Sequence, residues 1–178
     1  MTRTLLIAAA ALSLAACATA QEPAPAATPG VGTLEGWAAG NAQYLVVNSA
    51  RRGWTTTESG LQYRRVGPAH PNGRQPVATD TVKVHYRGTF VDGREFDSSY
   101  SRNEPAEFPL NRVIKGWTEG VALMREGETF EFVIPAALGY GERWVGGGEL
   151  PPSSTLLFTV ELLEVKAAAT PAGAAGAP

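Results

Sequence analysis

The chain contains few of the residues from which catalytic and metal centres are usually built. Its 178 residues include one cysteine and two histidines, so no intramolecular disulfide can form. Without a cluster of cysteine and histidine, the sequence predicts no metal site. It also has no Gly-x-Ser-x-Gly motif, and Gly146–Gly148 lack the lysine that a phosphate-binding loop requires. We therefore expect no metal site, no phosphate-binding loop and no serine nucleophile of that kind.

An excess of positive charge is also absent. The chain has 15 basic and 17 acidic residues and a net charge of -2, which gives no electrostatic basis for binding nucleic acid. The pairs Arg51–Arg52 and Arg64–Arg65 are short and isolated, as is typical of solvated surface. His70 lies in a Pro-Asn-Gly loop, and His85 alternates with apolar strand residues, so both are expected at the surface.

The most apolar stretch, at the N-terminus, is too short for a stable transmembrane span. Arg3 is followed by a run rich in alanine and leucine that ends at Ala16. A charged start followed by a short apolar run is typical of a secretory signal peptide. Residues 1–16 are therefore predicted to be a signal peptide.

The end of that run, Leu14–Cys17, resembles a bacterial lipobox. The resemblance implies that Cys17 becomes the lipidated N-terminus and anchors the protein to a membrane. Ala18 rather than aspartate after the cysteine implies the outer membrane of a Gram-negative bacterium, with the domain facing the periplasm. The alternative is an ordinary secretory signal that is cut near Ala18 or Ala20.

The remaining chain divides by composition into four segments. Residues 17–33 and 167–178 are rich in alanine, proline and glycine and cannot bury a core, so they read as a tether and a disordered tail. Residues 34–57 form a helical segment and residues 58–166 a domain of ordinary size. The i, i+3, i+4 spacing predicts one helix that ends near Gly53, with an apolar face made by Leu34, Trp37, Ala38, Ala42, Leu45 and Val46. That helix either packs on its own domain or pairs with a second copy.

The domain is predicted to consist mostly of strands. Apolar and polar residues alternate in the segments 61–66, 81–86, 128–134 and 156–165. Asp92-Gly93 is a strong hairpin signal. Trp117, Val121 and Met124 form the one good helical stripe. Strands around one short helix predict an α+β fold, in which an antiparallel twisted β-sheet wraps around one short α-helix.

Several blocks in this domain match one known family in order and spacing. They are Val84–Thr89, Gly93–Ser99, Val113–Val121, Gly139–Gly141, Leu150–Pro152 and Thr155–Phe158. Together they resemble the FKBP-type peptidyl-prolyl cis-trans isomerases over residues 58–166. The resemblance implies the same α+β fold and an enzyme that needs neither nucleophile nor cofactor. It also implies proline-containing unfolded or folding polypeptides as substrates, and macrolides of the tacrolimus and rapamycin type as possible ligands.

The resemblance further implies the residues of the site. Trp117 forms the floor under the proline ring, and the walls are Tyr86, Phe96 and Phe158. Val113 and Ile114 close one side, and the Ile114 N–H bonds a ligand carbonyl. The Tyr140 hydroxyl contacts the ligand backbone, and Asp97 lies at the edge. Phe108 and Leu150 contact the substrate, Leu150 from an overhanging loop. Taken alone, each aromatic could equally be core, and Asp97 could cap the Ser98-Ser99 turn.

Two departures from the family pattern bear on ligand choice. Ala106 stands where many members carry another aromatic, so a more open rim is expected. The segment 144–149 is about one residue longer than in related proteins and contains three consecutive glycines and Glu149. Exposed Trp144 could compensate on this loop. Besides catalysis, the sequence leaves open a binding module or holdase, and an envelope scaffold.

Overall fold

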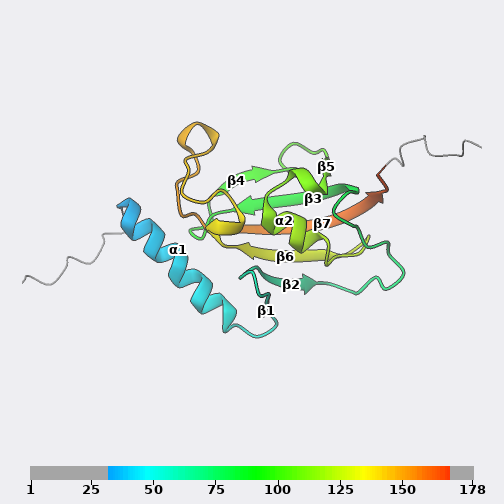
Figure 1. The fold of residues 1–178 in the computed structure, drawn as a ribbon, viewed down its shortest axis with the longest axis horizontal. Coiled ribbons are helices and arrows are strands. Elements are labelled where there is room, and N and C mark those ends of the chain that lie inside the picture. The colour runs from blue at the N-terminus through cyan, green and yellow to red at the C-terminus, as the bar shows by residue number, and fades with distance from the viewer. Residues whose placement is uncertain (1–31, 169–178) are drawn as a thin grey trace, which may run out of the picture.

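The computed structural model describes residues 32–168, which form two α-helices and seven strands (Figure 1). The elements in chain order are α1 (Leu34–Ser49), β1 (Thr55–Thr56), β2 (Gln62–Val66), β3 (Thr81–Thr89), β4 (Glu95–Ser98), β5 (Ala106–Pro109), α2 (Lys115–Val121), β6 (Thr129–Ile134) and β7 (Leu156–Lys166). Short 3₁₀ turns occur at Leu110–Arg112, Ala136–Leu138 and Gly146–Gly148. The alternating segments predicted as strands are β2, β3, β6 and β7, whereas β1 and β5 carry no alternation long enough to predict.

The strands form one sheet in the order β1-β2-β6-β7-β3-β4, and β5 pairs with β3 as well. Every pairing is antiparallel. The helix α2 lies against the middle of the sheet, and α1 crosses its end (Figure 1). The predicted α+β class, a twisted antiparallel sheet around one short helix, is confirmed.

The core lies between the sheet and α2. Strand alternation directs one side chain in two towards α2, and the inward set is fully or almost fully buried. Its members on the three central strands are Val82, Val84, Tyr86, Phe130, Phe132, Ile134, Leu156, Phe158, Val160 and Leu162. Two glycines let α2 approach the strands closely. A Cβ on Gly116 would lie 2.5 Å from the Ile134 side chain, and one on Gly120 would lie 2.7 Å from the Phe132 ring.

The predicted helix before the domain exists, but its packed face was predicted only in part, because Trp37 contacts the core whereas other members of the predicted face are exposed. It ends at Ser49 rather than near Gly53, and Leu34 and Val46, assigned to the apolar face, are 53% and 65% exposed. The face that packs is instead centred on Asn41 and Asn48, which are buried. Hydrogen bonds hold this helix together with the partly buried Trp37, so hydrophobic periodicity found only part of its docked face.

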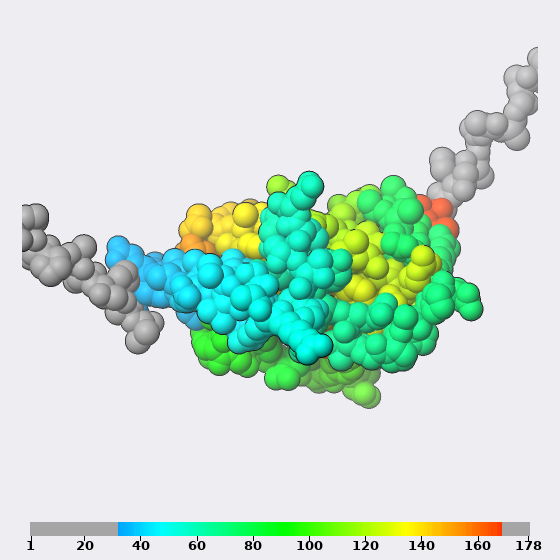
Figure 2. All heavy atoms as spheres, turned by 90° about the horizontal axis from the view of Figure 1, so that it is seen from below, coloured from blue at the N-terminus to red at the C-terminus, as the bar shows by residue number. Residues whose placement is uncertain are grey.

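Several hydrogen bonds and a ring contact dock α1 on the end of the sheet. Asn41 accepts a hydrogen bond from the Thr155 backbone N–H at 2.6 Å, and Asn48 donates one to Gln62 at 2.8 Å. The Trp37 ring meets Phe90 edge-on at 5.6 Å. Figure 2 shows α1, in blue to cyan, along the outside of the domain with one long side open to solvent. This outcome matches the alternative in which the helix packs on its own domain.

The predictions for residues 1–31 and 169–178 lie outside the described part of the chain. They include the signal peptide, lipidation of Cys17, most of the tether and most of the tail. Between residues 32 and 168, no helix is both long enough and apolar enough to cross a membrane.

Candidate active site

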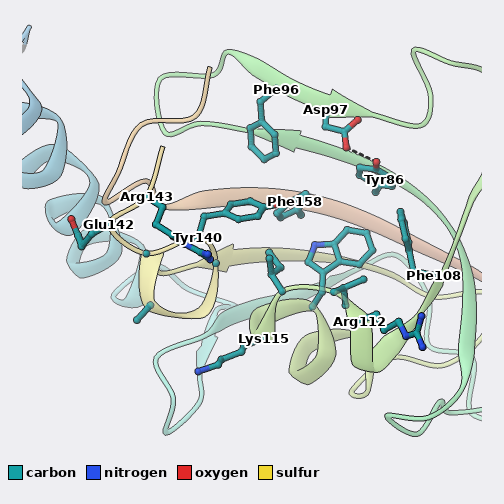
Figure 3. Close-up of a pocket in the computed structure, with 16 residues that line it drawn as sticks. Tyr86, Phe96, Asp97, Phe108, Arg112, Lys115, Tyr140, Glu142, Arg143 and Phe158 are labelled. Atoms are coloured by element: carbon teal, nitrogen blue, oxygen red, sulfur yellow. Dashed lines mark hydrogen bonds between the residues drawn. The ribbon is translucent and has the colours of Figure 1, made fainter. Parts of the chain in front are cut away.

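A cavity of about 750 Å³ opens between α2, the concave face of the sheet and the loop that follows β6. Figure 3 shows the side chains that line it. Nine of the ten predicted catalytic and substrate-contacting residues belong to this lining: Tyr86, Phe96, Asp97, Phe108, Val113, Ile114, Trp117, Tyr140 and Phe158. Residues from six separate parts of the chain thus converge on one hollow.

The centre of the cavity is an aromatic cluster around Trp117. The indole is 5% exposed. It meets the rings of Tyr86, Phe108 and Phe158 nearly at right angles, with centroids 5.2, 5.7 and 5.3 Å away. Phe96 in turn meets Phe158 edge-on at 5.5 Å. Edge-to-face contacts of this kind fix ring orientation as well as burying area. The floor is therefore apolar, and its rings are held in fixed orientations.

Three hydrogen-bonded polar side chains, Tyr86, Asp97 and Arg102, occupy one edge of the aromatic cluster. The Tyr86 hydroxyl donates to the Asp97 carboxylate at 2.5 Å, as the dashed line in Figure 3 marks. Arg102 donates to Asp97 at 2.6 Å and to the Tyr86 oxygen at 2.9 Å. Asp97 thus accepts bonds from two different side chains, which capping of the Ser98-Ser99 turn alone would not require. Sequence reasoning missed Arg102, because an arginine in a polar loop carries no pattern.

The protonation states of this group follow from its contacts. Partial burial acts to raise the pKa of Asp97, but the hydrogen bonds from Tyr86 and Arg102 outweigh it and hold the pKa below its usual value. Burial raises the pKa of the Tyr86 hydroxyl, and its bond to Asp97 raises it further. At neutral pH the edge therefore presents an ionised carboxylate next to a neutral phenol.

The start of α2 closes a second side of the cavity. Ile114 is the N-cap residue and Val113 precedes it in extended conformation. The first N–H groups of a helix have no intrahelical acceptor, and the Ile114 N–H makes no hydrogen bond to any other described residue. Thr118 fixes this corner by donating a hydrogen bond to the Leu110 carbonyl at 2.7 Å.

Tyr140 reaches the cavity from the loop after β6. Its hydroxyl makes no hydrogen bond to any other residue in the described range, whereas its ring contributes to the wall. Burial raises the pKa of this hydroxyl, and the charge of Asp97 adds to the effect. The hydroxyl therefore remains protonated and can donate to a ligand. Gly141, next in the chain, adopts a φ of 64°, a left-handed conformation that favours glycine, and also lines the cavity.

Leu150 is the one predicted substrate-contacting residue that the structure places elsewhere. It is 6% exposed, packs in the core and does not line the cavity. Its backbone instead pairs with Val145 and closes the loop that contains the three glycines. Trp144 on that loop is 54% exposed and is also absent from the lining, so its predicted compensating role is not supported. Ala106 packs against the core and does not line the cavity.

His85 is less exposed than the sequence predicted. Its ring stacks on Tyr100 with centroids 4.7 Å apart, and Nδ1 is 2.9 Å from the Ser99 hydroxyl. It lies outside the cavity, as does exposed His70. Within residues 32–168, no group of three or more histidine, cysteine, aspartate or glutamate side chains could hold a metal ion.

Four further charged residues line the mouth of the cavity and were not predicted. Arg112, Lys115 and Arg143 are basic and Glu142 is acidic. All four are exposed. Exposed charges in turns are common in any sequence, so only the position beside the cavity distinguishes them.

Known proteins share both the sequence and the fold. The profile of the family described as FKBP-type peptidyl-prolyl cis-trans isomerase matches residues 72–163. The FkpA isomerase of Aeromonas hydrophila is 52% identical over 126 residues, which are 70% of this chain and 45% of that protein. The outer membrane protein MIP of Legionella longbeachae is 43% identical over 126 residues, which are 71% of this chain and 53% of that protein.

The crystal structure of FkpA from Escherichia coli superposes with a TM-score of 0.69 at 44% identity, over 76% of this chain and 63% of that one. The chain thus spans about half the length of the curated relatives it matches. The matched profile covers more than half of the chain and contains most of the cavity residues. The chain therefore belongs to the family of FKBP-type peptidyl-prolyl cis-trans isomerases.

Proposed function

We propose that this protein is a peptidyl-prolyl cis-trans isomerase that accelerates rotation about Xaa-Pro bonds in folding polypeptides. The observation that carries the proposal is the rigid aromatic cavity around Trp117, with a carboxylate at its edge and hydrogen-bond donors at its sides. No covalent step is required. Uncatalysed rotation has a barrier of about 18–20 kcal/mol and takes tens to hundreds of seconds. A site that favours the twisted amide over the planar one is therefore sufficient for catalysis.

The cavity favours the twisted amide in two ways. The planar amide is polarised by resonance, and rotation removes that charge separation, so an apolar cavity disfavours the planar form more strongly. Fixed groups then stabilise the twisted form, because their positions cost no reorganisation during the reaction. In this proposal the proline ring rests on Trp117 between Tyr86, Phe96, Phe108 and Phe158. Val113 closes the side.

The polar groups hold the peptide on either side of the rotating bond. The Ile114 N–H and the Tyr140 hydroxyl donate hydrogen bonds to carbonyl groups of the bound peptide. Asp97, held ionised by Tyr86 and Arg102, biases the field at the twisted amide. A large apolar ligand such as rapamycin or tacrolimus would compete for the same cavity.

We further propose that the protein acts in the bacterial cell envelope. Residues 1–16 would direct export, and Cys17 would carry the lipid that anchors the domain to the outer membrane, facing the periplasm. Support comes from the lipobox-like sequence Leu14–Cys17 and from the outer membrane location named for the Legionella relative. Metabolic labelling with a radioactive fatty acid tests this directly. Label that disappears in Cys17→Ser supports the anchor, and an unlabelled wild-type protein refutes it.

A proline-limited refolding reaction tests the proposed activity. The wild-type protein is expected to speed the slow phase, and Asp97→Ala and Tyr140→Phe are expected to reduce that effect. Suppression of aggregation of the same client is measured in parallel. If both variants lose acceleration but keep suppression, the isomerase site is separate from any holdase function. If the wild type suppresses aggregation without speeding the slow phase, the protein is a holdase and the proposal fails.

A further inference from the structure

The mouth of the cavity has more positively than negatively charged side chains. Arg112, Lys115 and Arg143 are positive, and Glu142 is the only carboxylate besides Asp97 in the described lining. Asp97 is bonded to Arg102 at 2.6 Å, so this pair adds little net charge. The mouth is therefore positive, although the whole chain has a net charge of -2. A local field of the opposite sign to the net charge favours ligands of negative charge at that place.

The basic side chains are available to a ligand. Arg112 and Lys115 are exposed and form no hydrogen bond or ion pair with any other residue between 32 and 168. Arg143 donates one long bond, from Nε to the Tyr140 carbonyl at 3.4 Å. Glu142, in contrast, already accepts a bond from the Ser153 hydroxyl at 2.6 Å. Arg112 and Lys115 thus face solvent without a described partner and Arg143 has one long bond, while the Glu142 carboxylate is partly satisfied.

The positions of these cations flank the aromatic floor. Figure 3 shows Arg112 beside Phe108 and Arg143 beside Tyr140, at opposite sides of the cluster. Lys115 lies in the first turn of α2, next in sequence to the N-cap residue Ile114. In the proposed mode, with the proline on Trp117, the flanking residues of the chain leave through the mouth that these side chains line. Residues within about 10 Å of the proline, or roughly three positions, are then within reach.

We propose that Arg112, Lys115 and Arg143 give the site a preference for Xaa-Pro segments that carry aspartate or glutamate within three residues of the proline. The inference rests on the proposed isomerase function and names a substrate class for it. The residue directly before the proline is excluded from the preference, because it enters the apolar cluster. Each favourable carboxylate is expected to raise kcat/KM by about 3- to 10-fold at low ionic strength. Salt should weaken the effect, because all three cations are solvent-exposed.

A matched peptide series measures this preference. The peptides share a Leu-Pro bond and differ only two residues before or two residues after the proline, where they carry glutamate, glutamine or lysine. For the wild-type protein, kcat/KM should fall in the order glutamate, glutamine, lysine at low ionic strength. The three values should converge at high ionic strength. A glutamate-to-glutamine ratio near 1 at both positions overturns the inference.

Variants assign the preference to the named residues. Arg112→Gln/Lys115→Gln and Arg143→Gln should each reduce the glutamate-to-glutamine ratio. The matched control Arg52→Gln, which removes an exposed arginine outside the cavity lining, should leave the ratio unchanged. If every variant keeps the wild-type glutamate-to-glutamine ratio, the preference does not come from Arg112, Lys115 and Arg143. Circular dichroism checks that each variant is folded, which is expected because Arg112 and Lys115 bond no other described residue.

The same series separates failure of the inference from failure of the proposed function. Acceleration of the glutamine peptide by the wild type establishes the activity independently of any charge preference. If no peptide is isomerised, the proposed function fails. Binding of the same peptides, followed by fluorescence polarisation, then decides the inference. Tighter binding of the glutamate peptide supports the preference, and equal binding refutes it.

Discussion

Gly120 lies where α2 meets β6, and alanine at this position tests how closely the helix must approach the sheet. In a solvated helix, replacement of glycine by alanine stabilises by about 1 kcal/mol, because alanine loses less backbone entropy. Here the new methyl carbon would lie 2.7, 3.0 and 3.1 Å from three atoms of the Phe132 ring. That ring is 1% exposed and cannot move aside freely. Overpacking of a sealed core costs about 1–3 kcal/mol, so we expect a net loss of about 1–2 kcal/mol.

Gly40 is the matched control for this change. It lies within α1, and a Cβ there would meet nothing within 4 Å. Gly40→Ala should therefore stabilise by about 0.5–1 kcal/mol. Urea unfolding measures both variants, and the double change Gly120→Ala/Phe132→Leu should recover part of the loss. Because α2 carries Trp117, Gly120→Ala should also lower isomerase activity. If Gly120→Ala stabilises as much as Gly40→Ala does, the close packing of α2 on Phe132 is refuted.

Three further changes probe the edge, the walls and the docked helix. Asp97 has a lowered pKa, so its contribution to stability is present above the unfolded value near 3.8 and is lost as the pH falls through the folded value. Asp97→Asn should therefore lose less stability than the wild type between neutral and acid pH. The difference should be less than about 1 kcal/mol, since the Asp97 side chain is 42% exposed. If the urea midpoint shifts equally in both proteins between neutral and acid pH, this expectation is contradicted. Gly88→Ala would place a methyl group 2.7 Å from Phe96 and 2.8 Å from Phe158. The change should cost about 1–3 kcal/mol of stability and lower kcat/KM in a peptide assay. An unchanged kcat/KM would show that the two walls can move apart freely. Asn41→Ala leaves the buried Thr155 N–H without its acceptor, at a cost of about 1–3 kcal/mol of stability. The substitution should therefore speed hydrogen exchange at the Thr155 amide. An unchanged exchange rate would mean that other contacts hold α1.

Much of the fold was predictable because the alternation of apolar and polar residues indicates which face of a strand is buried. The four long strands and the stripe at Trp117 and Val121 followed from this pattern. The docked face of α1 followed only in part, because Trp37 belongs to the apolar pattern whereas Asn41 and Asn48 hold the helix through hydrogen bonds. The short strand β5 did not follow from the pattern, since four residues are too few for a periodic signal.

The site was predictable only as a set. No single aromatic distinguishes a cavity wall from a core residue, and it was the spacing of several blocks that indicated the cavity residues. Contacts between distant polar residues were beyond such reasoning. Arg102 reaches Asp97 through a loop whose path depends on the whole fold. Leu150 was assigned to the cavity by the resemblance of its loop to the family's overhanging loop, but its side chain is buried in the core and its backbone pairs with Val145.

The central claim is that the Trp117 cavity isomerises Xaa-Pro bonds. The most direct measurement is the cis-to-trans exchange rate of a short Leu-Pro peptide by magnetisation-exchange NMR, with the wild type, Tyr140→Phe and Trp117→Leu. Circular dichroism and urea unfolding establish that each variant is folded. The account predicts exchange well above the uncatalysed rate for the wild type, and a marked reduction in both variants. Exchange at the uncatalysed rate in the presence of the folded wild-type protein, or rapid exchange that survives both substitutions, would contradict it.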